Sequence, residues 1–154
     1  MKKIMQRSLV VAVAVLALSG IALADNDQDD CSSKTLRGTY VFAATGHNIV
    51  AGVPQPKAIV EVIEFHGDGK LSVPAATRSV NGAVARSLPG GTGKYTVEAG
   101  CTGTLAFGDT GPTFDVFLSP GGEKLWMIQT NPNTVFQGTA TRLLDDESRE
   151  RDLR

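Results

Sequence analysis

Residues 57–82 read KAIVEVIEFHGDGKLSVPAATRSVNG and show the pattern of the whole chain. Two strand-like runs, 57–66 (rich in valine and isoleucine) and 70–80, are separated by Gly-Asp-Gly at 67–69, and the second run ends at Asn-Gly at 81–82. β-Branched side chains suit a pleated, half-buried strand, and Asp-Gly and Asn-Gly pairs suit tight hairpin turns because they tolerate positive φ. This stretch therefore predicts consecutive antiparallel strands.

The same alternation of strand-like runs and turn residues continues from residue 36 to residue 143. Connections are short and rich in Asp-Gly, Asn-Gly and Gly-Gly, and no stretch after residue 30 shows a capped helical period. Pro74 is a point where the third strand can break. The predicted strands are 38–45, 57–66, 70–80, 83–88, 93–99, 102–107, 113–118, 123–130 and 134–143.

Eight or nine strands joined by short hairpin turns form either a closed up-and-down barrel or a two-sheet sandwich. Short sequential connections favour the meander, because a sandwich usually needs longer crossovers. We therefore predict an all-β fold, an antiparallel up-and-down (meander) β-barrel of about eight strands, with the sandwich as the alternative.

The N-terminus has the three-part pattern of a secretory signal peptide: three cations, an apolar run at 9–18, and the small-x-small motif Ala-Leu-Ala at 22–24. We predict a cleaved signal peptide at 1–24, a polar leader at 25–35, the barrel at 36–143 and a charged flexible tail at 144–154. The protein is then secreted or periplasmic, with no membrane anchor after cleavage.

The charge balance argues against polyanionic partners. The chain has 15 Lys and Arg against 16 Asp and Glu residues, and removal of residues 1–24 takes away three cations and no acid. The mature chain is mildly acidic, which disfavours nucleic acids and anionic membranes.

Cys31 and Cys101 are the only cysteines of the chain. In an exported protein a disulfide is the default interpretation of such a pair. A redox or nucleophilic cysteine is the alternative, but there is no CxxC motif and no histidine beside either residue. We predict a bridge that pins the N-terminal segment to the strand near Cys101.

Motifs for catalysis or metal binding are scarce. Only His47 and His66 are present, without an HxH or HExxH motif, and Asp68 lacks the spaced acidic neighbours of a calcium loop. No G-x-S-x-G or phosphate-binding loop is found. We predict neither a metal nor a cofactor, and whether the protein is an enzyme stays open.

Glu61 is the most informative polar residue, because it alternates with Ile59 and Ile63 on one face of its strand. If that face points inward, burial raises the pKa of the carboxyl unless a cation or donor meets it. Glu61 is then a polar anchor or an acid/base group in a ligand cavity; a structural ion pair, or an outward face, is the alternative. The candidate partners are Arg78, Arg86 and Arg142.

A barrel of this size holds either packed side chains or one small ligand. For any single aromatic residue, core packing is the plain alternative. Several strands are apolar on both faces, so the second face must be covered or left as an exposed patch, and this predicts a homo-oligomer. The candidate ligand-binding residues are Tyr40, Phe42, Glu61, Ile63, Phe65 and Trp126.

One wider pattern joins Cys31 and the segment 36–40 (LRGTY) to 63–69 (IEFHGDG), 79–82 (SVNG), 93–97 (GKYTV) and 101–104 (CTGT). It resembles a group of small secreted bacterial proteins of uncharacterised function, which in turn resemble the calycin-type barrels, allene-oxide-cyclase-like and lipocalin-like. The likeness covers most of residues 31–142, and His66 stands where a commoner FDGxG turn has Asp.

The resemblance implies a small antiparallel barrel with an apolar cavity and no cofactor. Allene oxide cyclases hold a fatty-acid epoxide in a shaped pocket, and none of their catalytic residues can be placed on this chain. We therefore expect a protein that binds a small hydrophobic or amphipathic ligand in its interior. The alternatives are a cofactor-free cyclase or isomerase acting on a lipid-like substrate through Glu61, and a non-catalytic protein-interaction module that uses an outer apolar face.

Overall fold

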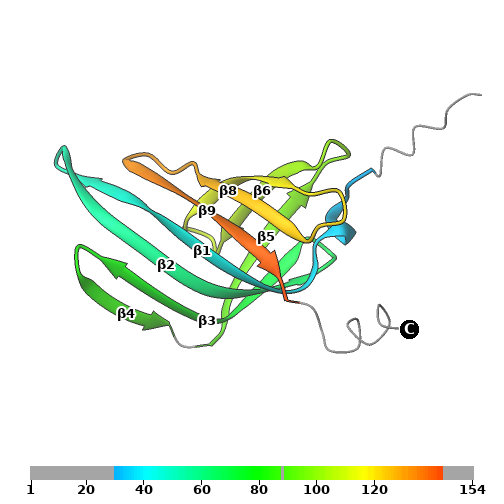
Figure 1. The fold of residues 1–154 in the computed structure, drawn as a ribbon, viewed down its shortest axis with the longest axis horizontal. Helices are drawn as coiled ribbons and strands as arrows, with labels where there is room; N and C mark the ends of the chain where they lie inside the picture. The colour runs from blue at the N-terminus through cyan, green and yellow to red at the C-terminus, as the bar shows by residue number, and fades with distance from the viewer. Residues whose placement is uncertain (1–29, 88, 144–154) are drawn as a thin grey trace, which may run out of the picture.

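The computed structural model describes residues 30–87 and 89–143. The predicted signal peptide, residues 25–29 of the leader and the tail at 144–154 lie outside the described residues. Within the described ranges, no helix is long and apolar enough to cross a membrane. The described chain begins with a single 3-10 turn, η1 (Ser33–Thr35), and continues in strands (Figure 1).

All nine predicted strands are present. They are β1 (Arg37–Val50), β2 (Val53–His66), β3 (Lys70–Val80), β4 (Ala83–Ser87), β5 (Gly91–Val97), β6 (Thr102–Phe107), β7 (Thr113–Leu118), β8 (Lys124–Gln129) and β9 (Thr134–Arg142).

The first hairpin is longer than predicted. β1 and β2 pair without interruption up to the turn at 51–52, well beyond the ends expected at 45 and 57. The extra length contains Pro54 and Pro56, which are unusual in a sheet. They are tolerated because β2 pairs with β3 only from Lys57 onward, so this part of β2 is an edge.

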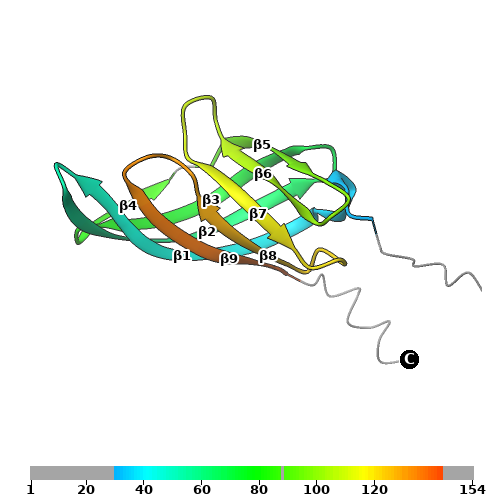
Figure 2. The same cartoon turned by 90° about the horizontal axis from the view of Figure 1, so that it is seen from above.

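The sheet closes on itself. Its order is β2-β1-β9-β8-β7-β6-β5-β3-β4, and β2 also pairs with β3, so β1, β2, β3 and β5–β9 form a closed ring. All pairings are antiparallel and nearly all join consecutive strands. The predicted up-and-down barrel of eight strands is confirmed, and the sandwich is excluded. β4 is an additional strand that pairs with β3 (Figure 2).

A bulge in β3 opens one end of this barrel. The first part of β3, Lys70–Val73, pairs with β5, whereas its last residues, from Ala76, pair with β4. The register with β2 shifts by one residue in between, at Pro74. Proline has no backbone N–H to donate, and it fits here because the bulge already interrupts the hydrogen bonds between β2 and β3. Pro74 therefore bends β3 without ending it. The hairpins β1–β2 and β3–β4 therefore extend beyond β5 and β6, at the left of Figure 1.

The opposite end of the barrel is filled by a packed core. The Phe65 ring makes edge-to-face contacts with Tyr40 and Tyr95, at centroid distances of 5.0 and 5.1 Å. Edge-to-face aromatic pairs add to the energy of burial itself. The largest fully buried side chains are Tyr40, Phe42, Phe65, Leu36, Ile63, Leu71, Leu105, Leu125, Met127 and Val116.

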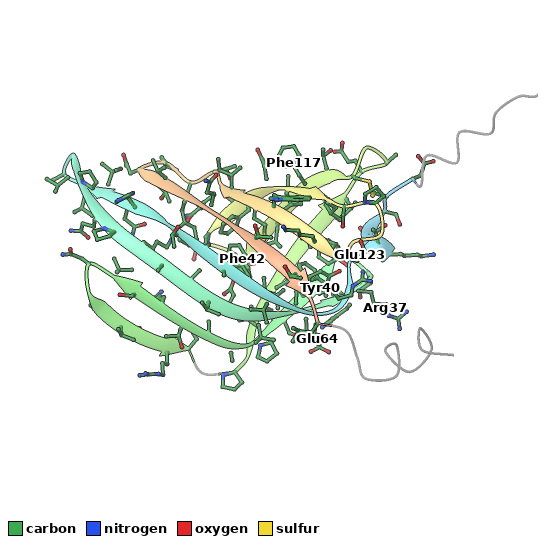
Figure 3. All side chains as sticks on the ribbon, in the orientation of Figure 1. Arg37, Tyr40, Phe42, Glu64, Phe117 and Glu123 are labelled. Atoms are coloured by element: carbon green, nitrogen blue, oxygen red, sulfur yellow. A yellow bond between two sulfur atoms is a disulfide. The ribbon has the colours of Figure 1, made fainter. Side chains whose placement is uncertain are left out.

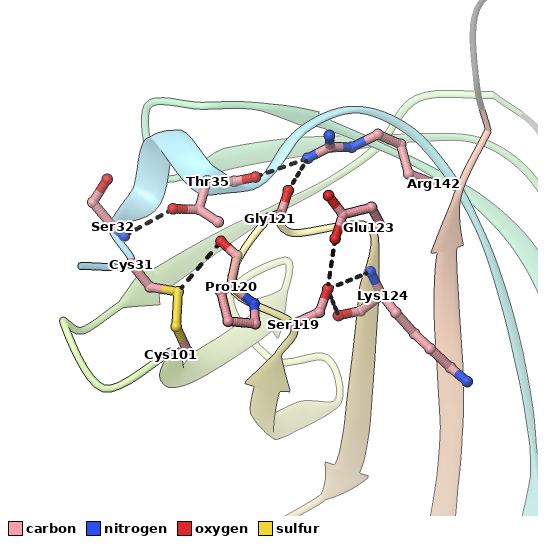
Figure 4. The surroundings of a disulfide bond; sticks show 10 residues. All are labelled: Cys31, Ser32, Thr35, Cys101, Ser119, Pro120, Gly121, Glu123, Lys124 and Arg142. Carbon is pink, nitrogen blue, oxygen red and sulfur yellow. Dashed lines mark hydrogen bonds between the residues drawn. A yellow bond between two sulfur atoms is a disulfide. The ribbon is translucent and has the colours of Figure 1, made fainter. Parts of the chain in front are cut away.

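The N-terminal segment plugs this closed end (Figure 4). The predicted disulfide joins Cys31 to Cys101 in the β5–β6 connection, with 4.9 Å between their Cα atoms. Next to it, the Arg142 guanidinium at the end of β9 donates to the carbonyl of Thr35 (2.9 Å). The Tyr95 hydroxyl donates to the carbonyl of Leu36 (2.9 Å). The disulfide thus pins the N-terminal segment to the barrel, as predicted.

Candidate ligand site at the flared end of the barrel

A cavity of about 340 Å³ opens at the flared end of the barrel. Phe42 on β1, Glu61 on β2 and Ala76 on β3 are cross-strand neighbours and form its floor. The packed core lies directly below this level. We call this cavity the cup. Other apolar side chains in its wall are Ile59, Val73, Phe107 and Phe136.

Strand alternation and the β3 bulge together decide which residues face the cup. On β2, Lys57, Ile59 and Glu61 follow each other at every second position, so they share the inner face. On β3, strict alternation from Val73 would bring residues 75 and 77 inward. The extra residue at the bulge reverses this, and Ala76 and Arg78 line the cup instead.

Glu61 is a buried charged residue at the cup floor, with 8% of its surface exposed. Burial raises the pKa of its carboxyl to about 7, and the charge of Lys57 offsets part of this rise. Protonated and ionised forms therefore both exist near neutral pH, the condition under which a carboxyl can donate or accept a proton.

The predicted arginine partners of Glu61 lie in three different places. Arg78 lines the cup, Arg86 is exposed on β4, and Arg142 donates through Nε to the hydroxyl of Tyr40 (2.9 Å) at the closed end. The cation whose charge acts on Glu61 is Lys57, which our reading of the sequence missed. Its position four residues before Glu61 was the available signal, because residues an even number apart in a strand share a face.

Lys57 is held at the rim of the cup by a chain of hydrogen bonds. Its Nζ donates to Oε1 of Gln129 (3.0 Å) and lies 4.1 Å from the centre of the Phe136 ring. The Gln129 Nε2 in turn donates to Oδ1 of Asn131 (2.9 Å), which also accepts the backbone N–H of Thr113 (2.8 Å). Desolvation, followed by the charge of Arg78, lowers the pKa of Lys57.

The six candidate ligand-binding residues are divided among three places. Phe42 and Glu61 meet in the cup. Tyr40, Ile63 and Phe65 are fully buried in the packed end, below the cup floor. Trp126 points out of the barrel with 47% of its surface exposed, because Leu125 and Met127 on either side of it take the inner face of β8.

Trp126 belongs to a groove on the outside of the barrel, of about 630 Å³. Its cross-strand neighbour Phe117 and the next outward residue, Ile128, stand on one side, and Val60 of β2 stands on the other. Small residues such as Ala43 on β1 lie between them. Figure 3 shows Phe117 on the outer surface, in contrast to Phe42 in the interior. We call this surface the outer groove.

No group of three or more potential metal-binding side chains occurs in the part of the chain that the structure describes. Comparison with protein-family models, with curated proteins and with solved structures finds no match. The class of the molecule is therefore given by its fold alone: a closed, eight-stranded, antiparallel up-and-down β-barrel.

Proposed function

We propose that this is an exported binding protein whose cup holds one small amphipathic molecule. The observation that carries the proposal is a cavity of about 340 Å³ that combines aromatic walls with a few charged groups. Small-molecule sites are mostly apolar hollows of roughly 300–1,000 Å³ in which a few polar groups fix the orientation of the ligand. The cup lies at the small end of that range.

The buried carboxyl of Glu61 supports this interpretation. Burying an ionisable group costs free energy, and a well-packed apolar residue in its place is often as stabilising or more so. A barrel selected only for stability has no need of Glu61 beneath an open cavity. A polar group of a bound molecule gives this carboxyl a partner.

The likeness to calycin-type barrels supports the same function, because eight-stranded barrels such as lipocalins hold one small ligand in their interior. The signal-peptide pattern at 1–24 and the disulfide agree with export to an oxidising compartment, where the protein would meet its ligand.

Binding of N-phenylnaphthylamine, an uncharged fluorescent probe, tests the proposal with two adjacent substitutions. Ala76→Phe places a ring in the cup, whereas Ala75→Phe places the same ring on the exposed outer face of β3. We expect saturable binding to the wild type and to Ala75→Phe, and an affinity lower by about tenfold or more in Ala76→Phe, because the space is filled. Equal binding by both variants, with both shown to be folded by circular dichroism, would contradict the proposal.

A cofactor-free cyclase or isomerase is the second candidate, and the raised pKa of Glu61 favours it. A carboxyl that titrates near pH 7 beside an apolar cavity suits general acid/base catalysis. If this candidate holds, Glu61→Gln loses turnover of a lipid-like substrate but keeps its affinity for the probe. Loss of both together would identify Glu61 as a binding residue only.

A contact between copies of the chain is the third candidate, and the outer groove favours it. Phe117, Trp126 and Ile128 are each about half exposed, and the residues that line the groove carry no charge. Exposed apolar side chains gathered on one face mark interaction surfaces, and a second copy of the chain presents a matching face.

A further inference from the structure

We propose that the ligand of the cup carries an acidic head group, and that Lys57 and Arg78 bind this head group at the rim while an uncharged body lies below it. This inference rests on the proposed binding function and adds the chemical class of the ligand. It depends on the arrangement of three charges in the cup and on the way Lys57 is held.

Two cations and one acid line the cup, and they lie at different depths. Glu61 is at the floor, level with Phe42 and Ala76. The next inward-facing residue of β2 toward the opening is Ile59, and its cross-strand partner on β3 is Arg78. Lys57 is the inward-facing residue after Ile59 and lies closest to the opening. The positive charges are therefore at the rim and the carboxyl is beneath them.

The two cations are neighbours on one wall of the cup. Lys57 is two residues from Ile59, the cross-strand partner of Arg78, so the two side chains are diagonal neighbours on the inner face. Desolvation lowers the pKa of Lys57, and the charge of Arg78 lowers it further because like charges repel each other. An anion bound between them would relieve this repulsion and make charge-assisted hydrogen bonds with both.

Hydrogen bonding fixes Lys57 in a position to bind such an anion. The backbone N–H of Thr113 can only donate, so the Asn131 atom that receives it is the oxygen. The same oxygen accepts from the amide nitrogen of Gln129, which turns the Gln129 oxygen toward Lys57. This contact uses one of three N–H donors of the ammonium.

Glu61 sets the direction in which the ligand enters. Near neutral pH part of the Glu61 population is ionised, and a second negative charge at the cup floor would be repelled. The acidic head group is therefore favoured at the rim, and the portion that reaches the floor is uncharged. A molecule with an acid at both ends is disfavoured.

Displacement of N-phenylnaphthylamine by three eight-carbon chains tests this inference. At pH 6, octanoate is ionised while the Glu61 carboxyl is mostly protonated. We expect octanoate to displace the probe at concentrations roughly ten- to hundredfold lower than octanol, the range given by one charge-assisted hydrogen bond. Octylammonium should be the weakest competitor. Added salt should weaken the competition by octanoate and leave the competition by octanol unchanged, because only the charged head group is screened.

Matched substitutions assign the effect to the rim. The ratio of the octanol to the octanoate concentration needed for displacement is compared within each variant, so that any change in affinity for the probe cancels. Lys57→Met and Arg78→Met should each lower this ratio, because each removes one of the two cations at the rim. Arg86→Met removes an arginine from the exposed strand β4 and should leave the preference unchanged. A loss of preference in Arg86→Met equal to that in Arg78→Met would mean that overall charge, and no rim site, attracts the acid.

The outcomes separate the two proposals. If the probe binds in a manner sensitive to Ala76→Phe but octanoate and octanol compete equally, the acidic head group is wrong and the cup function stands. If octylammonium competes best, Glu61 is the anchor and the inference is overturned. If Ala76→Phe leaves probe binding unchanged, the function fails and the inference with it. Octanoate does not absorb near 280 nm, so a change in the fluorescence of Trp126 on titration with octanoate alone, without the probe, would place octanoate in the outer groove and overturn both.

Discussion

Lys57 and Phe136 meet across Gly46. Both residues pair with Gly46, one from β2 and the other from β9, and the Lys57 Nζ lies 4.1 Å from the centre of the Phe136 ring. A Cβ at position 46 would collide with the backbone of Val135 and Phe136. Glycine at this position allows β9 to approach β1 closely, and with it brings the ammonium and the ring together at the rim of the cup.

We therefore expect Gly46→Ala to destabilise the barrel by about 1–3 kcal/mol, the range for overpacking of a close contact. Urea denaturation measures this change. Gly100→Ala is the matched control, because a Cβ at Gly100 meets nothing within 4 Å, and it should stay within about 0.5 kcal/mol of the wild type. Equal effects of the two substitutions would show that the close approach of β9 to β1 does not matter.

The carboxyl of Glu61 makes stability depend on pH in a defined direction. Its pKa is near 7 in the folded state and near 4.5 in the unfolded chain, so the folded state binds more protons between these values. Stability should fall as pH rises from about 4.5 to 7, by on the order of 3 kcal/mol from this group alone. Glu61→Gln should gain stability relative to the wild type at pH 8 and not at pH 4.5. A difference between the two proteins that is the same at both pH values would rule out the raised pKa.

The disulfide closes a loop with a sequence separation of 70 residues. In the chain-entropy picture a loop of this length contributes about 4 kcal/mol by restricting the unfolded state. We expect reduction, or replacement of both cysteines by serine, to lower the free energy of unfolding by up to this amount while the barrel stays folded. The double serine variant should be insensitive to reductant; a further loss on reduction would point to another cause.

If the outer groove joins copies of the chain, light scattering at tens of micromolar should give a mass above that of one chain. Trp126→Gln, alone or with Phe117→Thr, should shift the mass toward the monomer, since both side chains are about half exposed in the groove. Val135→Thr is the control, because Val135 is an exposed valine that does not line the groove. A monomeric mass for the wild type would refute self-association through this face.

Turn residues made the strands of this protein easy to predict. Turn residues such as Gly, Pro, Asn and Asp mark the ends of strands locally, and the runs of β-branched and aromatic residues between them predicted all nine strands. The first hairpin was underestimated because Pro54 and Pro56 look like loop residues. These prolines are compatible with a strand only where that strand has one neighbouring strand. Whether a strand has one neighbour or two is decided by the assembled sheet and cannot be read from the local sequence.

The site was harder to predict, for two physical reasons. Alternation shows which residues share a face but leaves open which face is inside, so Trp126 and Phe42 looked equivalent. The bulge at Pro74 adds one residue to β3 and so brings Ala76 and Arg78 inward, a shift that depends on the pairing of β3 with three other strands. Glu61 was found because its immediate neighbours on the same face are isoleucines, a signal that is local to one strand.

The cup is the binding site that we propose for this protein. Mapping the backbone amide shifts of the labelled protein during titration with octanoate tests this claim most directly. We expect the largest shifts around Lys57, Glu61 and Ala76, with the indole N–H of Trp126 unmoved. Shifts centred on Trp126 and Ile128, or no saturable shifts at all, would contradict it.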